Sequence, residues 1–384
     1  MPHLSIGQVK TQFFTHGEFA FEDGTVLSEI TVAYETYGKL NADHSNAVLL
    51  FHALSGSQHA AGINPAIEAV GDMWTEECRP GWWDDFIGPG KALNTNRFFI
   101  ICANYIGGCY GSTGPGSINP ATGQPYGSAF PHLCASDVVR SQAALLDHLG
   151  IEKLNAVAGA SIGGLLAFSF ATLFPHRVGR VVSIASGLRT TVLSRLFCFE
   201  QVIAIENDPH FNGGDYYNKS LPEYGLCLAR MISHKTFVHL DSIERRARKD
   251  VVKPDDRLSF YRVGHNVESY MLHQGRKFVQ RFDANSYLRI MELWLGFDPV
   301  RDAGATDMKE LLHRCHDHKQ EWLIFSIDSD YCFYPEEQAE LEHHLTKASV
   351  KNIHMTVHSV KGHDSFLLEP ALYTPHLDYL LNGR

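Results

Sequence analysis

Two kinds of hydrophobic period alternate along the first half of the chain. Two segments between strand-like runs have apolar positions at helical spacing: 136–150, which Gly150 ends, and 165–174, which Pro175 closes. The strand-like runs themselves, several of them apolar almost throughout, are 31–37, 46–54, 97–103, 154–158 and 178–185. Strands that are apolar on both sides and alternate with helices predict an α/β fold, with a mostly parallel sheet covered by helices on both faces.

The pattern changes between residues 187 and 298. Strand signals are missing there, and aromatic and charged residues recur at helical spacing around 229–238 and 285–295. We interpret 187–298 as a helical cap inserted between two strands of the sheet.

Strand character returns after this insertion. Residues 321–327 and 352–357 are strand-like, and the chain ends in a predicted helix near 370–381. We therefore expect residues 1–186 and 299–384 to form one α/β core.

Composition and charge exclude several classes of function. Of 384 residues, 44% are hydrophobic and 20% are charged, which is typical of a folded chain with a large core. The net charge of −10 argues against a nucleic-acid partner, because phosphate binding requires a basic surface. No apolar run approaches the ~18 residues that a membrane-spanning helix needs.

Residues 1–5 and the cysteines bear on the compartment. Met-Pro-His-Leu-Ser has neither the cationic start nor the apolar core of a secretory leader, so we expect a cytoplasmic protein. The eight cysteines include no Cys-x-x-Cys pair, and we expect no disulfide framework.

The sharpest chemical signal is the segment Gly159-Ala160-Ser161-Ile162-Gly163, which follows a predicted buried strand and opens a helix. This context is typical of a nucleophile elbow, in which flanking glycines permit a strained turn that exposes the serine hydroxyl. We expect Ser161 to be a nucleophile.

A serine nucleophile needs an imidazole to accept its proton and a carboxylate to orient that imidazole. Asp328 and Asp330 follow the predicted strand 321–327, and His363 follows the last predicted strand. The order serine, aspartate, histidine along the chain matches the order usual for such an elbow. The spacing does not separate Asp328 from Asp330.

The oxyanion that forms during acyl transfer requires two N–H donors. One comes from the residue after the nucleophile, and the second from a loop after an early strand. The loop His52-Ala53-Leu54-Ser55-Gly56 has this position, so we expect the N–H groups of Leu54 and Ile162 to be the donors.

Two other clusters are poor candidates for a site. His313, Cys315, His316 and His318 crowd along one predicted helix, where they point in different directions and match no zinc spacing, so we expect no metal site. The glycine-rich stretch 107–115 lacks the Gly-Lys-Ser/Thr ending of a phosphate loop. We interpret it as a shaped loop beside the active site.

Combined motifs along nearly the whole chain resemble those of the homoserine O-acetyltransferase family, which has the α/β-hydrolase fold. The matching segments include 34–38, 52–56, 81–84, 88–91, 107–109, 111–115, 117–123, 212–216, 228–231, 267–270, 281–287 and 362–367. Members of this family acylate homoserine or serine on the way to methionine or cysteine. The resemblance implies the same fold and an acyl-CoA-dependent transfer.

The resemblance also implies roles for individual residues. Ser161 is the nucleophile, His363 the base and Asp330 the third member of the triad. Arg230 holds the carboxylate of the acceptor and Asp364 its ammonium, which suits a guanidinium fork and an acidic side chain. Acyl-CoA enters as a substrate rather than a cofactor, and the family implies a homodimer formed through the cap.

Some positions depart from the family pattern. Phe237 stands where the family usually has tyrosine, Cys198 and Val202 replace an asparagine and an arginine of the cap, and Leu165-Leu166 replace Met-Gln. If these positions line the acceptor pocket, the pocket is more apolar than homoserine requires, since one missing hydrogen bond costs ~1 to 3 kcal/mol. A short-chain ester hydrolase with the same triad is therefore the alternative function.

Overall fold

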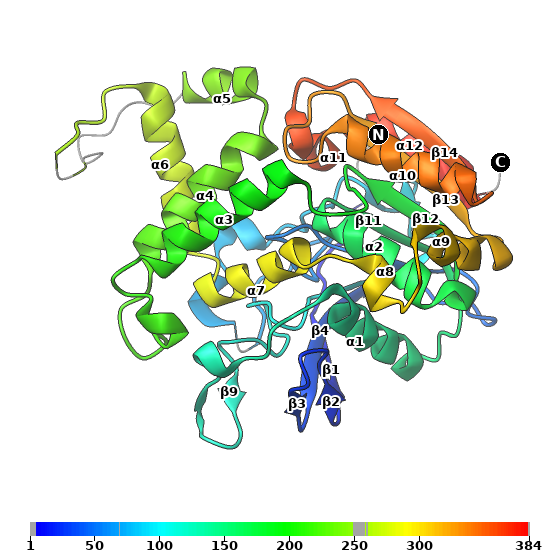
Figure 1. The fold of residues 1–384 in the computed structure, drawn as a ribbon, viewed down its shortest axis with the longest axis horizontal. Coiled ribbons are helices and arrows are strands. Elements are labelled where there is room, and N and C mark those ends of the chain that lie inside the picture. Colours follow the sequence, from blue (N-terminus) through cyan, green and yellow to red (C-terminus); the bar gives the residue numbers. More distant parts are fainter. Residues whose placement is uncertain (1–4, 69, 249–257, 259, 383–384) are drawn as a thin grey trace.

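An eight-stranded sheet runs through the middle of the computed structural model, which describes residues 5–68, 70–248, 258 and 260–382 (Figure 1). Its order is β1-β4-β8-β5-β11-β12-β13-β14. The edge strand β1 pairs antiparallel with β4, β4 pairs antiparallel with β8, and the strands from β8 to β14 run parallel. The strands are β1 (Gln12–His16), β4 (Ile30–Tyr37), β5 (Ala47–Phe51), β8 (Phe99–Ala103), β11 (Leu154–Ala160), β12 (Val178–Ile184), β13 (Glu321–Ile327) and β14 (Lys351–Val357).

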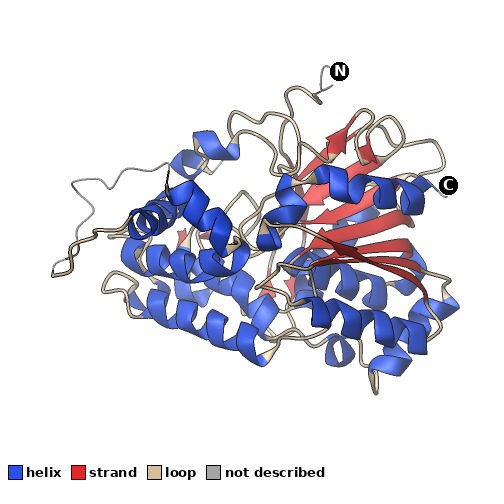
Figure 2. Cartoon of the chain, turned by 90° about the horizontal axis from the view of Figure 1, so that it is seen from above, coloured by secondary structure: helices blue, strands red, loops and turns tan. Residues whose placement is uncertain are grey.

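Helices cover both faces of this sheet (Figure 2), as the continuously apolar strands require. In β5, Leu49 and Phe51 belong to one core cluster, and Val48 and Leu50 belong to the other. The first cluster includes residues of α1 (Ala135–His148), α2 (Ile162–Leu173), α9 (Met308–Asp317) and α10 (Pro335–Lys347), and the second includes α12 (Pro370–Asn382). The predicted α/β fold with a mostly parallel, doubly covered sheet is confirmed.

The described part of the interval between β12 and β13 forms helices and loops. Helix α4 packs against both α3 and α6, and α3 to α6 lie together to one side of the sheet (Figure 1). The α-helices in the described part of this interval are α3 (Val192–Glu206), α4 (Glu223–Phe237), α5 (Leu240–Ala247), α6 (Asn266–Val279), α7 (Ala284–Leu295), α8 (Pro299–Asp302) and α9, whose bounds are given above. The predicted domain boundaries at 186/187 and 298/299 stay predictions.

Several elements differ from those predicted by the hydrophobic pattern. Helix α2 begins at Ile162, three residues before the predicted start, and its first turn contains Gly163 and Gly164. A Cβ at Gly163 would lie 2.2 Å from the carbonyl oxygen of Phe51, so these glycines allow the helix to pack closely on the sheet. Strand β5 ends at Phe51 rather than at 54, which leaves residues 52–56 as a loop.

Short elements complete the chain. They are the strand pairs β2 (Phe19–Ala20) with β3 (Val26–Leu27), β6 (Ile87–Gly88) with β7 (Leu93–Asn94) and β9 (Ile118–Asn119) with β10 (Gln124–Pro125), the helix α11 (Ser365–Leu368), and 3-10 turns such as Glu76–Cys78 and Gly362–Asp364. Within the described ranges, no helix has both the length and the apolar character that crossing a bilayer demands. Residues 1–4 belong to the segment on which the expectation of no secretory leader rests, and they lie outside those ranges.

Candidate active site

Ser161 occupies the sharp turn between β11 and α2. Its backbone has φ +59° and ψ −129°, a left-handed conformation that is costly for a residue with a Cβ. A Cβ at Gly159 would lie 2.0 Å from the carbonyl oxygen of Gly163, so the two ends of the turn can approach this closely only because residue 159 has no side chain. Such a strained strand-to-helix turn is the geometry of a nucleophile elbow.

His363 and Asp330 meet at the carboxyl ends of β14 and β13. The Nδ1 atom of His363 lies 2.7 Å from Oδ2 of Asp330, and both side chains are buried. The other carboxylate oxygen accepts the backbone N–H groups of Cys332 at 2.7 Å and Phe333 at 3.0 Å. Since Asp330 is held by three donors, it fixes the ring orientation of His363.

The free nitrogen of His363 has the properties of a proton acceptor. Burial is the largest single effect and lowers the pKa of His363, but the charge and hydrogen bond of Asp330, together with the charges of Asp364 and Glu337, outweigh it. The pKa is therefore raised above its ordinary value. Nε2 is buried and has no hydrogen-bond partner among the described residues. An imidazole with Nδ1 bound to a carboxylate and Nε2 free can accept a proton from a hydroxyl.

Asp328, which sequence spacing left as an equal candidate, lies in a different environment. Its Oδ2 is 2.8 Å from Nδ1 of His358, and its Oδ1 accepts the N–H of Ser359 at 3.0 Å. The side chain of His358 is 82% exposed, so this second carboxylate and imidazole pair lies at the surface. Of the two aspartates, only Asp330 contacts His363 in the described structure.

A cavity of about 260 Å³ opens above Ser161 and His363. Leu54, a predicted oxyanion donor, lines it, as do Ser55 and Gly56 of the same loop. Ile162, the other predicted donor, is the first residue of α2, where a helix has N–H groups without an intrahelical acceptor. The expected nucleophile, base and one N–H donor therefore surround a single space.

Arg230 of α4 and Asp364, the residue after His363, line the same cavity. The guanidinium carbon of Arg230 lies 4.8 Å from the ring centre of Phe278 and 5.5 Å from that of Phe237, and its Nε is buried without a partner in the described structure. Burial lowers the pKa of Arg230, and the positive charge of Arg281 adds to this shift. Burial raises the pKa of Asp364, against the effect of neighbouring positive charges. Arg230 and Asp364 thus place groups of opposite charge in the same cavity.

Of the departures from the family pattern, Phe237 is the one that lines this cavity. Its ring centre lies 5.9 Å from that of His363. Cys198 is fully buried in the main core cluster, Val202 packs against that cluster, and neither lines the cavity. Leu165 and Leu166 are also core residues. Of these positions, only Phe237 therefore meets the condition of lining the cavity.

Arg281 is a cavity residue that the sequence interpretation did not single out. Its Nη1 donates to the carbonyl oxygen of Ser55 and lies within 3.3 Å of the Tyr110 hydroxyl, which in turn donates to the Arg281 carbonyl. Tyr110 belongs to the glycine-rich stretch, which is therefore a loop beside the site. Arg281 lies in one of the segments that resemble the family, and this resemblance is the sequence signal that could have identified it.

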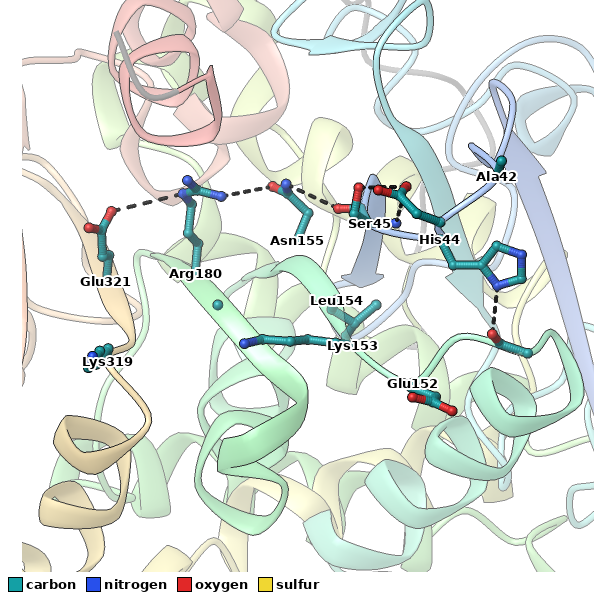
Figure 3. Close-up of a pocket in the computed structure, with 13 residues that line it drawn as sticks. Ala42, His44, Ser45, Glu152, Lys153, Leu154, Asn155, Arg180, Lys319 and Glu321 are labelled. Atoms are coloured by element: carbon teal, nitrogen blue, oxygen red, sulfur yellow. Dashed lines mark hydrogen bonds and ion pairs between the residues drawn. The ribbon is translucent and has the colours of Figure 1, made fainter.

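A larger groove, of about 690 Å³, lies at the opposite ends of the parallel strands (Figure 3). Several of its polar groups are paired: Arg180 contacts Asn155 at 3.3 Å and Glu321 at 3.9 Å, and Nδ1 of His44 lies 2.7 Å from the carbonyl oxygen of Gly150. None of Ser161, His363 and Asp330 lines this groove. The larger volume of this groove is therefore no reason to place the catalytic site there.

The histidines and the cysteine near the end of α9 are not arranged as a group of metal ligands in the described structure. Cys315 is buried in the core, and Nδ1 of His316 lies 2.8 Å from the carbonyl oxygen of Ser349. Throughout the described ranges, no three histidine, cysteine or acidic side chains are arranged to hold a metal ion.

Comparisons with known proteins agree with this geometry. The family model described as the alpha/beta hydrolase fold matches residues 46–369. The chain is 42% identical over 371 residues to a homoserine O-acetyltransferase of Deferribacter desulfuricans, covering 96% of this chain and 94% of that protein. It is 43% identical over 368 residues to a homoserine O-succinyltransferase of Magnetococcus marinus, covering 94% and 90%.

Solved structures of a transferase and of an esterase both have the fold of this chain. The homoserine O-acetyltransferase from Bacillus anthracis superposes with a TM-score of 0.86 at 28% identity, covering 97% of this chain and 98% of that chain. A protein named esterase E22 superposes with a TM-score of 0.85 at 26% identity, covering 97% and 100%. Similarity of fold alone therefore does not separate acyl transfer from ester hydrolysis.

Proposed function

Since the chain belongs to the α/β-hydrolase fold family, and within it to the homoserine O-acyltransferases, we propose that it transfers an acyl group from acyl-CoA to the hydroxyl of homoserine through Ser161. The observation that carries the proposal is one cavity containing Ser161, His363 and the oppositely charged pair Arg230 and Asp364. Acyl-CoA is a substrate in this scheme, and no step uses a bound cofactor.

In the first step the Ser161 hydroxyl attacks the thioester carbonyl of acyl-CoA. Nε2 of His363 accepts the hydroxyl proton, and Asp330 stabilises the imidazolium that results. The N–H groups of Leu54 and Ile162 stabilise the negative charge that develops on the carbonyl oxygen. The C–S bond then breaks, CoA leaves with the proton from His363, and acyl-Ser161 remains.

In the second step homoserine replaces CoA in the cavity. Arg230 binds its carboxylate and Asp364 its ammonium, which directs the hydroxyl toward acyl-Ser161. His363 accepts the proton of this hydroxyl, the new ester bond forms, and the proton returns to the Ser161 oxygen as the acyl group departs. An ester hydrolase would use water at this point, so the acceptor contacts are what distinguish the two activities.

The direct test follows CoA release from acetyl-CoA and from succinyl-CoA, with and without L-homoserine or L-serine. Both donors are needed, because relatives of nearly equal identity are named for acetyl and for succinyl transfer. We expect sustained CoA release only with an amino-acid acceptor. Rapid hydrolysis of a short acyl ester without any response to acceptor would instead establish the hydrolase.

The variant Arg230→Ala tests the proposed acceptor site in the same assay. We expect it to raise the KM for homoserine by about 10- to 100-fold, since a charged hydrogen-bonded pair is lost, and to leave the KM for acyl-CoA nearly unchanged. Equal changes in both KM values would place Arg230 outside the acceptor site.

We also propose that the protein forms a homodimer through α3. Val192, Leu196, Phe199 and Ile203 recur at helical spacing along one side of α3, and all four are exposed, Phe199 to 57%. A continuous exposed apolar stripe of this kind is typical of an interaction surface. The resemblance to a family that dimerises through its cap makes a second copy the expected partner.

Sedimentation equilibrium tests the dimer. We expect twice the chain mass of 42.9 kDa for the unaltered protein, and a shift toward the single-chain mass for Phe199→Glu. Leu372→Glu, which places the same charge on the exposed Leu372 of α12, is the matched control and is expected to leave the mass unchanged. A single-chain mass for the unaltered protein would contradict the proposal.

A further inference from the structure

The peptide group between Ala53 and Leu54 is held in one orientation by two contacts to its carbonyl oxygen. The backbone N–H of Gly56 donates to this oxygen at 2.9 Å, and Nδ1 of His52 lies 2.8 Å from it. In a trans peptide the C=O and N–H bonds point in opposite directions. Whatever fixes the Ala53 carbonyl therefore also fixes the direction of the Leu54 N–H.

The ring of His52 has no freedom to change this contact. Its side chain is fully buried and stacks on Tyr105, with ring centres 3.7 Å apart and ring planes at 15°. The Tyr105 hydroxyl donates to the carbonyl of His52 itself. A Cβ at Gly56 would lie 2.9 Å from Cβ of His52 and 3.1 Å from its Nδ1, so the loop closes directly onto the ring.

The protonation state of His52 follows from the same surroundings. A carbonyl oxygen only accepts hydrogen bonds, so Nδ1 carries the proton. Nε2 is buried and makes no geometrically good hydrogen bond in the described structure, so burial disfavours a second proton. Burial lowers the pKa of His52 to about 4, although the contacts with the Ala53 carbonyl and with the Asn104 side chain oppose this shift. At neutral pH the ring is a neutral donor with its one proton on the Ala53 side.

We infer that His52 is a positioning residue, whose Nδ1–H fixes the Ala53 carbonyl and so directs the Leu54 N–H toward the acyl oxygen bound at Ser161. The inference rests on the proposed function, in which that N–H stabilises the oxyanion. His52 itself does not touch the substrate, and it is absent from the residues that line the cavity. Its effect should therefore appear in the chemical steps and not in substrate binding.

The test compares three substitutions at this position by the rate of acylation of Ser161 and by kcat and KM. For His52→Leu, which has no donor, we expect acylation to slow by about 10²-fold with both KM values within about threefold, as for loss of an oxyanion donor. In His52→Asn, the side-chain N–H occupies nearly the place of Nδ1–H. We expect it to restore the rate to within about tenfold of the unaltered enzyme.

His52→Gln carries the same amide one methylene further out, and we expect it to resemble His52→Leu. If the His52→Leu variant does not fold, the comparison of His52→Asn with His52→Gln still tests the inference. His44→Leu is the matched control, because Nδ1 of His44 also contacts a backbone carbonyl, that of Gly150, but far from the cavity. It should change the acylation rate by less than about twofold.

Equal rates for the asparagine and glutamine variants, or a loss confined to KM, would overturn the inference. Acylation is measured with p-nitrophenyl acetate as well as with acyl-CoA, since the ester requires the same oxyanion donor. An enzyme acylated by the ester but not by acyl-CoA would contradict the proposed function, while the comparison at His52 would still decide the positioning role.

Discussion

Replacing Ser161 with alanine is expected to abolish the acyl-enzyme and to lower kcat by on the order of 10⁵-fold or more, as for other serine nucleophiles. Without the hydroxyl, His363 has no proton to accept and acyl-CoA has no attacking atom in the cavity. Alanine keeps the Cβ of serine, so the strained φ of +59° and the packing of the turn are unchanged. The loss of activity therefore reports the hydroxyl and not the fold.

Mass spectrometry of the intact protein after incubation with acyl-CoA measures this directly. The unaltered enzyme should gain the mass of one acyl group, and Ser161→Ala should gain none. Ser169→Ala is the matched control, because Ser169 is a buried serine of α2, the helix that Ser161 precedes, and it does not line the cavity. A persistent mass gain in Ser161→Ala, or turnover within about tenfold of the unaltered enzyme, would remove Ser161 from the nucleophile role.

Two of the strands that the hydrophobic pattern predicted, β5 and β13, are buried along nearly their whole length, so their sequences are apolar throughout. The apolar run does not mark where β5 ends, because it continues past Phe51 into the following loop. Strand β14 was also predicted, although most of its residues are half-buried or exposed. Helices α3, α5 and α6 were not predicted individually. In α3 the exposed stripe is itself apolar, so the contrast between a buried and an exposed side is weak. Helix α5 has only eight residues, too few to establish a period.

Some residues of the candidate site could likewise be predicted from the sequence, and others could not. Ser161 was predictable because a strained turn requires small neighbours, which a sequence displays. Arg281 was not, because its contact with Ser55 joins residues 226 positions apart through the packing of the insertion onto the core. His52 is also hidden in the sequence, since its role depends on which carbonyl its ring faces.

The choice between Asp328 and Asp330 illustrates the limit of spacing. Both follow β13 within three residues, and spacing does not show that Asp330 is the one turned inward. The structure separates them by their partners, His363 for Asp330 and His358 for Asp328. The two aspartates therefore offer a matched pair of substitutions.

Asp330→Asn is expected to lower kcat by about 10⁴-fold while the protein stays folded. Three donors face the carboxylate: the N–H groups of Cys332 and Phe333 on one oxygen, and Nδ1 of His363 on the other. An amide has a single oxygen, and that oxygen satisfies more donors if it faces the two backbone N–H groups. Its NH₂ then faces Nδ1 of His363, which must become an acceptor.

A neutral His363 ring that accepts at Nδ1 carries its proton on Nε2, the nitrogen that is not bound to residue 330. It then cannot take the proton of Ser161, so the variant retains the nucleophile and the substrate contacts but loses the base. Asp328→Asn makes the same chemical change two residues earlier and is expected to keep kcat within about threefold, since the His358 pair is exposed. This prediction is tested by measuring steady-state kcat and KM, together with melting temperatures, for both variants. Comparable losses in the two variants would mean that the inward contact of Asp330 is not what sets the proton on His363.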